Sequence, residues 1–135
     1  MKLKEIKKVA EEIFSEREEV ITAYIYGSFL RSEFFEDVDV GLLIEDYFNP
    51  DALYEARIAG QFEQKLKLKG NFDVRILNRR PLRFLFSILK NSEVVYCKNE
   101  RRRVEFESRI MKEYLDIKPH HEIYDRMRRM RYANR

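Results

Sequence analysis

The sequence has little cysteine and no long apolar run, and each absence excludes a class of protein. Cys97 is the only cysteine among 135 residues, so an internal disulfide is excluded. No apolar run approaches the length of about 20 residues that spans a bilayer. The N-terminal stretch MKLKEIKKVAEEIF is charged throughout, unlike a signal peptide with its apolar centre. We therefore expect a soluble protein in the reducing cytoplasm.

The chain also lacks internal repeats, low-complexity stretches and linkers, and its length suits one domain with a real core. Charge is distributed unevenly along it. The formal net charge is +3, but residues 118–135 hold six Lys or Arg against two acidic residues, which leaves −1 for the rest. We predict a domain over residues 1–117 and a basic C-terminal tail over 118–135. A solvated helix is preferred for this tail over a nucleic-acid-binding segment, since short charge runs have little specificity.

Hydrophobic periodicity predicts that helices and strands alternate along the chain. Helices are predicted over residues 3–14, about 29–34, about 50–68, the segment opened by Pro81, and 100–116, and strands over 20–26, about 37–44, 71–77 and 93–97. We expect Gly70 to end the third helix and Pro119 to interrupt the last one. This order predicts a single α/β (α+β) domain, with a mixed sheet of about four strands covered by helices mainly on one side.

Acidic residues recur on one face of the predicted sheet. Strand 37–44 alternates, so Asp37 and Asp39 share the face opposite its apolar residues. Asp73 has the same kind of place in strand 71–77. Clustered carboxylates repel one another and need a counter-charge, for which Mg²⁺ is the natural candidate. If the two strands are neighbours, Asp73 either binds a second ion or takes a proton from an attacking hydroxyl.

A Gly-Ser turn precedes these acids and is suited to holding phosphates. Gly27 allows a ligand to approach the backbone closely, and the helix beginning at Ser28 presents free N–H groups. Arg31, one turn later, is placed for a bidentate grip on the same phosphates. Tyr24 and Tyr26 precede the turn, and we interpret them as sheet-face packing in preference to nucleotide stacking. The combination suits nucleotidyl transfer to an acceptor hydroxyl.

The motif GS, followed at a fixed offset by DVDV and later by an acid in FDVRIL, resembles the nucleotidyltransferase superfamily that includes the DNA polymerase beta palm. It is most similar to the minimal nucleotidyltransferases (MNT) that are paired with HEPN-domain toxins. The resemblance covers most of the chain, including YIYGSFLRSEFFEDVDVGLLI and RPLRFLFSIL. The resemblance implies that Gly27 and Ser28 form the nucleotide-holding turn and that Asp37 and Asp39 are the metal pair. It also implies that Asp73 is the third carboxylate and that Arg31 is the arginine found in MNT antitoxins.

The resemblance also implies a reaction and a partner. The expected activity is transfer of AMP from ATP to a hydroxyl, with a tyrosine of a HEPN toxin as acceptor, and with two Mg²⁺ ions. The toxin is the expected partner, no membrane is involved, and homo- and hetero-oligomers both remain open. An alternative is an antitoxin that neutralises by masking the toxin without turnover. Its motivation is Glu36, which stands where many relatives have serine before the first metal acid.

Overall fold

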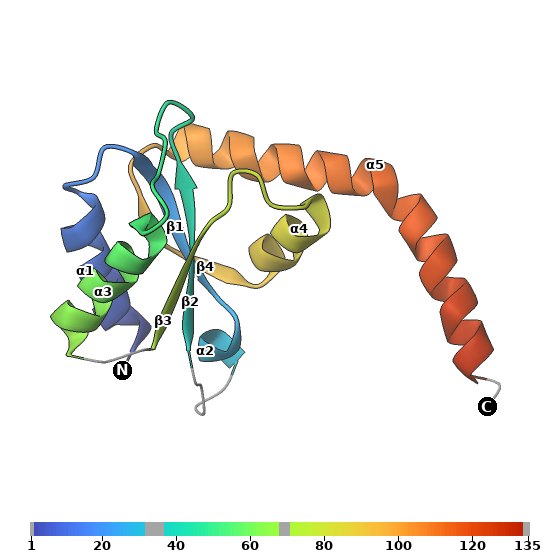
Figure 1. Ribbon diagram of the computed structural model, residues 1–135. Coiled ribbons are helices and arrows are strands. Elements are labelled where there is room, and N and C mark those ends of the chain that lie inside the picture. The colour runs from blue at the N-terminus through green and yellow to red at the C-terminus, as the bar shows by residue number, and fades with distance from the viewer. Residues whose placement is uncertain (1, 32–36, 68–70, 134–135) are drawn as a thin grey trace.

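The computed structural model describes residues 2–31, 37–67 and 71–133, with side chains for all of them except Arg31 and residues 117–133. In these residues helices and strands alternate along the chain (Figure 1). Their order is α1 (Leu3–Phe14), β1 (Val20–Tyr26), α2 (Ser28–Arg31), β2 (Val38–Ile44), α3 (Tyr54–Leu66), β3 (Phe72–Ile76), α4 (Leu82–Lys90), β4 (Ser92–Cys97) and α5 (Glu100–Ala133). The bounds of α1 and β1 are those that the periodicity predicts.

The strands form one mixed sheet in the order β3-β2-β1-β4. β1 pairs antiparallel with β2 and with β4, and β2 pairs parallel with β3. Helix α3 makes the crossover between the two parallel strands, because parallel neighbours cannot be joined by a tight turn. The predicted mixed sheet of about four strands is confirmed, and the strand that carries the paired aspartates lies between two neighbours.

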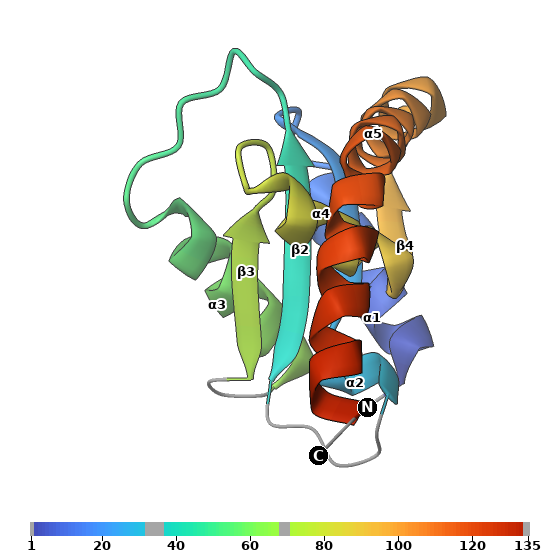
Figure 2. The same cartoon turned by 90° about the vertical axis from the view of Figure 1, so that its right-hand side faces the viewer.

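Helices cover both faces of this sheet (Figure 2). On one face, α1 and α3 cover the apolar side of β2, and Phe62 of α3 belongs to the same buried cluster. The β2 residues in this cluster are Val38, Val40, Leu42 and Ile44. On the other face, Leu43 of β2 lies in a second cluster with Phe106 of α5 and with side chains of α4. The prediction that helices cover mainly one face is therefore wrong. The physical reason is that β1 is a central strand. Its first six residues, which point alternately to the two faces of the sheet, are all buried.

Helix α3 is shorter at both ends than the predicted helix over residues 50–68. Before it, the carboxylate of Asp51 accepts a hydrogen bond from the backbone N–H of Leu53 at 2.9 Å, which holds a turn where the helix was expected to begin. After it, Lys67 adopts a left-handed conformation with φ of 57° and ends the helix. Gly70, the predicted end, lies outside the described residues.

Helix α5 continues far beyond its predicted end. The structure carries it without a break to Ala133, so the prediction that Pro119 interrupts it is wrong. A proline inside a helix removes one hydrogen bond and crowds the preceding turn, which bends a helix when it does not end it. Figure 1 shows such a bend along α5: the first half leads away from the sheet, and the distal half turns to run roughly along the strand direction, apart from the sheet. Among the described residues, no helix is long and apolar enough to cross a bilayer.

The first half of α5 has one buried and one exposed apolar side. Phe106 and Ile110 are buried against the sheet and α4. Val104, Met111 and Leu115, which lie on one line of the helix, are 48%, 44% and 54% exposed. Helix α5 is thus attached to the sheet by a narrow apolar contact.

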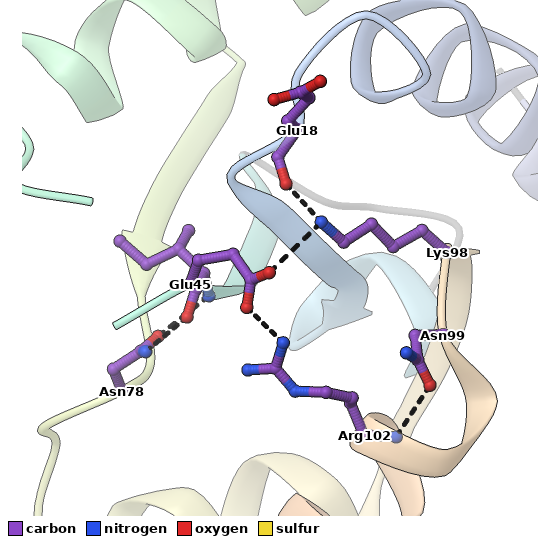
Figure 3. A network of polar contacts seen from close by, with 7 residues as sticks. Glu18, Glu45, Asn78, Lys98, Asn99 and Arg102 are labelled. Carbon is purple, nitrogen blue, oxygen red and sulfur yellow. Dashed lines mark hydrogen bonds and ion pairs between the residues drawn. The ribbon is translucent and has the colours of Figure 1, made fainter. Parts of the chain in front are cut away.

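A polar network joins three elements at the end of the sheet where β2 finishes (Figure 3). The carboxylate of Glu45 accepts hydrogen bonds from Lys98 at 3.4 Å and from the guanidinium of Arg102 at the start of α5. Lys98 also donates to the backbone oxygen of Glu18. The Asn78 amide makes two hydrogen bonds, of 2.7 and 3.0 Å, with the backbone at the end of β2. The ends of β2 and β4 and the first turn of α5 are therefore held together by charge.

Candidate active site

The Gly-Ser turn lies at the opposite end of β2, where β1 ends. Gly27 has φ of +84°, a conformation that favours glycine, and its carbonyl accepts a hydrogen bond from the N–H of Leu30 in α2. A Cβ atom placed on Gly27 would lie 2.2 Å from Oδ2 of Asp39. The absence of a side chain therefore lets the carboxylate of Asp39 lie directly against the turn.

Asp39 occupies the centre of the candidate site. In β2 it pairs with Tyr26 of β1 on one side and with Asp73 of β3 on the other. The three residues therefore form a row across the sheet, on the face that α4 and α5 cover. Asp37 is exposed and lies directly before β2. The shared face predicted for Asp37 and Asp39 assumed a strand from residue 37, whereas β2 begins at Val38, so this placement of Asp37 stays a prediction.

The third predicted carboxylate is engaged by a neighbouring arginine. Asp73 forms an ion pair of 3.1 Å with Arg75, and their side chains are 42% and 44% exposed. The charge of Asp73 raises the pKa of Arg75, so the guanidinium stays protonated. In the described ranges, no group of three or more His, Cys, Asp or Glu side chains is arranged to hold a metal ion.

Mg²⁺ takes hard oxygen ligands and is commonly bound by one or two carboxylates together with substrate phosphates. Asp39 supplies one carboxylate directly against the Gly27 turn, and Asp37 lies two residues before it in the chain, so the oxygen donors present fit that mode. A site built from protein carboxylates alone would need Asp73 to leave Arg75. The residues present therefore favour an ion shared with a bound triphosphate.

A cavity of about 260 Å³ opens at the row of polar residues. It is lined by residues of the turn, the sheet and α4, namely Tyr26, Gly27, Asp39, Phe84, Ser87, Ile88 and Asn91. Larger cavities, of about 420 and 530 Å³, lie at the other end of β2 around Asn78 and Arg79. We assign the site to the smaller one, because it contains both the positive-φ glycine and the aspartate that touches it.

The hydroxyl of Tyr26 is a feature of this cavity that the sequence interpretation missed. It is buried and has no hydrogen-bond partner among the described residues. Burial, followed by the nearby charge of Asp39, raises the pKa of Tyr26 to about 12, so the hydroxyl keeps its proton at neutral pH. Packing on the sheet face is confirmed for the ring. The tyrosine at the strand end was a signal in the sequence, but its unpartnered hydroxyl was not visible there.

Two other predicted residues are only partly placed. Ser28 is the first residue of α2, as expected for the helix that begins at this residue. Arg31 ends α2 and is described only in its backbone, so its reach towards a phosphate stays a prediction. Glu36 lies outside the described residues.

Comparison with known proteins agrees with this geometry. The family model described as polymerase beta, nucleotidyltransferase matches residues 7–101, which include the turn, the paired aspartates and β3. The chain therefore belongs to the polymerase beta nucleotidyltransferase family. No curated protein matches its sequence.

Solved structures with the same fold come from toxin–antitoxin pairs. A mutant of the toxin–antitoxin MntA-HpeT has a TM-score of 0.68 at 13% identity, covering 94% of this chain and 99% of that one. A toxin–antitoxin with AMP-PNP has a TM-score of 0.67 at 14% identity, covering 94% and 99%. The complex of tri-AMPylated Shewanella oneidensis HEPN toxin with MNT antitoxin has 0.63 at 15%, covering 93% and 95%. The nucleotidyltransferase fold expected from the motif is thus confirmed.

Proposed function

We propose that this protein is a Mg²⁺-dependent nucleotidyltransferase that transfers AMP from ATP to a tyrosine hydroxyl of a HEPN toxin and acts as its antitoxin. The observation that carries the proposal is the contact between the Gly27 turn and the carboxylate of Asp39, in a chain of the polymerase beta family. The solved relatives support the nucleotide and the partner, since one contains AMP-PNP and another contains an AMPylated HEPN toxin.

The chemistry assigned to the site follows from the positions of its residues. The backbone at Gly27 and Ser28 would bind the triphosphate, while Asp37 and Asp39 would hold Mg²⁺. The ion would supply charge stabilisation at the reacting phosphate. The acceptor oxygen forms a bond to the α-phosphorus, the bond to pyrophosphate breaks, and the proton of the hydroxyl passes to Asp73. This last role requires Asp73 to exchange its contact with Arg75 for the incoming hydroxyl.

Transfer of label from ATP tests the proposal directly. The purified protein is incubated with the product of the neighbouring gene, which the proposal expects to be a HEPN protein, together with Mg²⁺ and ATP labelled at the α-phosphate. We expect label on a tyrosine of the HEPN protein, and loss of at least 100-fold in rate for Asp39→Asn, because an amide holds Mg²⁺ poorly. The matched control is Asp46→Asn, an exposed aspartate beyond the other end of β2, which should transfer at the wild-type rate.

Absence of label with the wild-type protein, or equal transfer by Asp39→Asn, would contradict the assigned chemistry. Removal of Mg²⁺ with EDTA should abolish transfer, and its return should restore it.

The ion pair between Asp73 and Arg75 favours a second candidate function, because Asp73 is then engaged with Arg75 and not with a metal ion or a hydroxyl. On this alternative the protein keeps the nucleotidyltransferase fold and neutralises the toxin by masking it. The double variant Asp37→Asn, Asp39→Asn separates the two. A variant that folds and still protects cells from the toxin supports masking. A variant that folds and binds the toxin but no longer protects supports AMP transfer.

A further inference from the structure

The Tyr26 hydroxyl is the one buried side-chain polar atom in the described residues that lacks a hydrogen-bond partner. A buried hydroxyl without a partner has given up its hydrogen bonds to water and received none in return, so it destabilises the folded chain. Phenylalanine would fill the same space on the sheet face without this cost. Within the described part of the chain, the hydroxyl therefore makes no hydrogen bond that would account for a tyrosine here.

Its surroundings point to a ligand. Tyr26 directly precedes Gly27 at the end of β1 and lines the same cavity of about 260 Å³ as Gly27 and Asp39. The charged groups that act on the hydroxyl belong to β2, to β3 and to the loop after β3, namely Asp39, Arg75, Asp73 and Arg80. The hydroxyl is thus a neutral donor at one end of the polar row, beside Asp39. A neutral O–H group can approach an anionic oxygen where a further carboxylate would repel it.

We propose that the Tyr26 hydroxyl donates a hydrogen bond to a phosphate oxygen of the nucleotide bound at the Gly27–Ser28 turn. The inference rests on the proposed function, because it requires a triphosphate at that turn. It assigns to Tyr26 a role in holding the nucleotide that goes beyond packing on the sheet. Binding of the nucleotide would supply the partner that the hydroxyl lacks in the empty protein.

The variant Tyr26→Phe removes only this oxygen, and two measurements test its role. Isothermal titration with AMP-PNP and Mg²⁺ should show a dissociation constant raised about tenfold or more, as loss of a hydrogen bond to a charged group requires. The melting temperature of the chain without nucleotide should stay the same or rise, since the unpartnered group is gone.

Tyr24→Phe is the matched control. Tyr24 lies two residues earlier on the same strand and face, but its hydroxyl donates to Glu107 of α5 at 3.3 Å. We expect this variant to melt at a lower temperature and to bind AMP-PNP with the wild-type affinity. The two tyrosines should therefore show opposite patterns in stability and in binding.

Equal AMP-PNP affinity of wild type and Tyr26→Phe would overturn the inference and leave the proposed function standing. A clear fall in the melting temperature of Tyr26→Phe without nucleotide would also overturn it, because the hydroxyl would then have a structural partner. A wild-type protein that binds no AMP-PNP would overturn both the inference and the proposed nucleotide site.

Discussion

The backbone of Gly27 and the carboxylate of Asp39 lie so close that no side chain fits between them. Two separate demands meet at this glycine. Its φ of +84° is disfavoured for residues with a Cβ atom, and the space where that atom would stand is occupied by Oδ2 of Asp39. Any replacement of Gly27 must therefore disturb either the turn or the aspartate.

Gly27→Ala should lower the free energy of unfolding by about 1–3 kcal/mol, through left-handed strain and displacement of Asp39. Urea denaturation followed by circular dichroism measures the change. The matched control is Gly60→Ala in α3, where an added methyl group meets no described atom within 4 Å. This control should gain about 0.5–1 kcal/mol, because alanine favours a helix over glycine. Equal effects of the two substitutions would contradict the assigned geometry of the turn.

The features of the candidate site that depend on backbone geometry alone were predictable from the sequence. The two-residue period of a strand places Asp39 on the polar face of β2, and the parallel pairing of β2 with β3 brings Asp73 beside it. The ion pair of Asp73 with Arg75 and the unpartnered hydroxyl of Tyr26 were not predictable. Both depend on which rotamers the neighbouring strands and α4 leave open, and no sequence pattern records that choice.

At the scale of elements, α5 depends on a few buried residues for its attachment. Ile110 is 1% exposed and lies in the cluster formed with the sheet and α4, whereas the adjacent Met111 is 44% exposed. The ring of Tyr114 also stacks on Phe86 of α4, with ring centroids 3.7 Å apart. Phe106 and Ile110 are the buried residues of α5 up to residue 116, where its side chains are described, so loss of one of them should destabilise the fold strongly.

Ile110→Ala should therefore lower the free energy of unfolding by about 2–4 kcal/mol, since it leaves a cavity under α5. Met111→Ala removes a side chain of similar size from the exposed side and should change stability by less than about 0.5 kcal/mol. Urea midpoints of the two variants provide the comparison. A larger loss for Met111→Ala would mean that α5 packs through its other side.

Strong local patterns made some elements predictable, and competing local signals obscured others. The amphipathic pattern of α1 is typical only of a helix, and the apolar run of β1 is typical only of a buried strand. Both elements have the predicted bounds. Asn49-Pro50 looked like a helix start, but the Asp51 side chain holds a turn first. Pro119 looked like a helix end, yet α5 continues past it to Ala133, with a bend in place of a break (Figure 1).

At the scale of the whole molecule, the Glu45 network joins parts of the chain that are far apart in sequence. Burial acts to raise the pKa of Glu45, but hydrogen bonds and charges of Arg102 and Lys98 outweigh it and hold the pKa below its usual value. A carboxyl whose pKa is lower in the folded state stabilises the fold above its unfolded pKa. That stabilisation is lost as the pH falls through the folded pKa.

Glu45→Gln should lower the free energy of unfolding at pH 7 by about 1–3 kcal/mol, because two charged hydrogen bonds lose their anion. The difference from wild type should shrink below about pH 4. There the unfolded carboxyl takes up its proton first, and the folded one follows at lower pH. Urea denaturation at a series of pH values follows both effects. Glu16→Gln, at an exposed position before β1, serves as the control and should show a small difference at every pH. A constant difference for Glu45→Gln across the series would exclude an ionic role.

The long C-terminal helix affects the hydrodynamic behaviour of the protein. Its 34 residues correspond to about 50 Å of helix, more than the diameter of about 35 Å expected for a compact body of some 100 residues. Because the distal half of α5 stands apart from the sheet in Figure 1, friction with the solvent exceeds that of a sphere of equal mass. Gel filtration against spherical standards will overestimate the mass of a monomer, and static light scattering will give the true value.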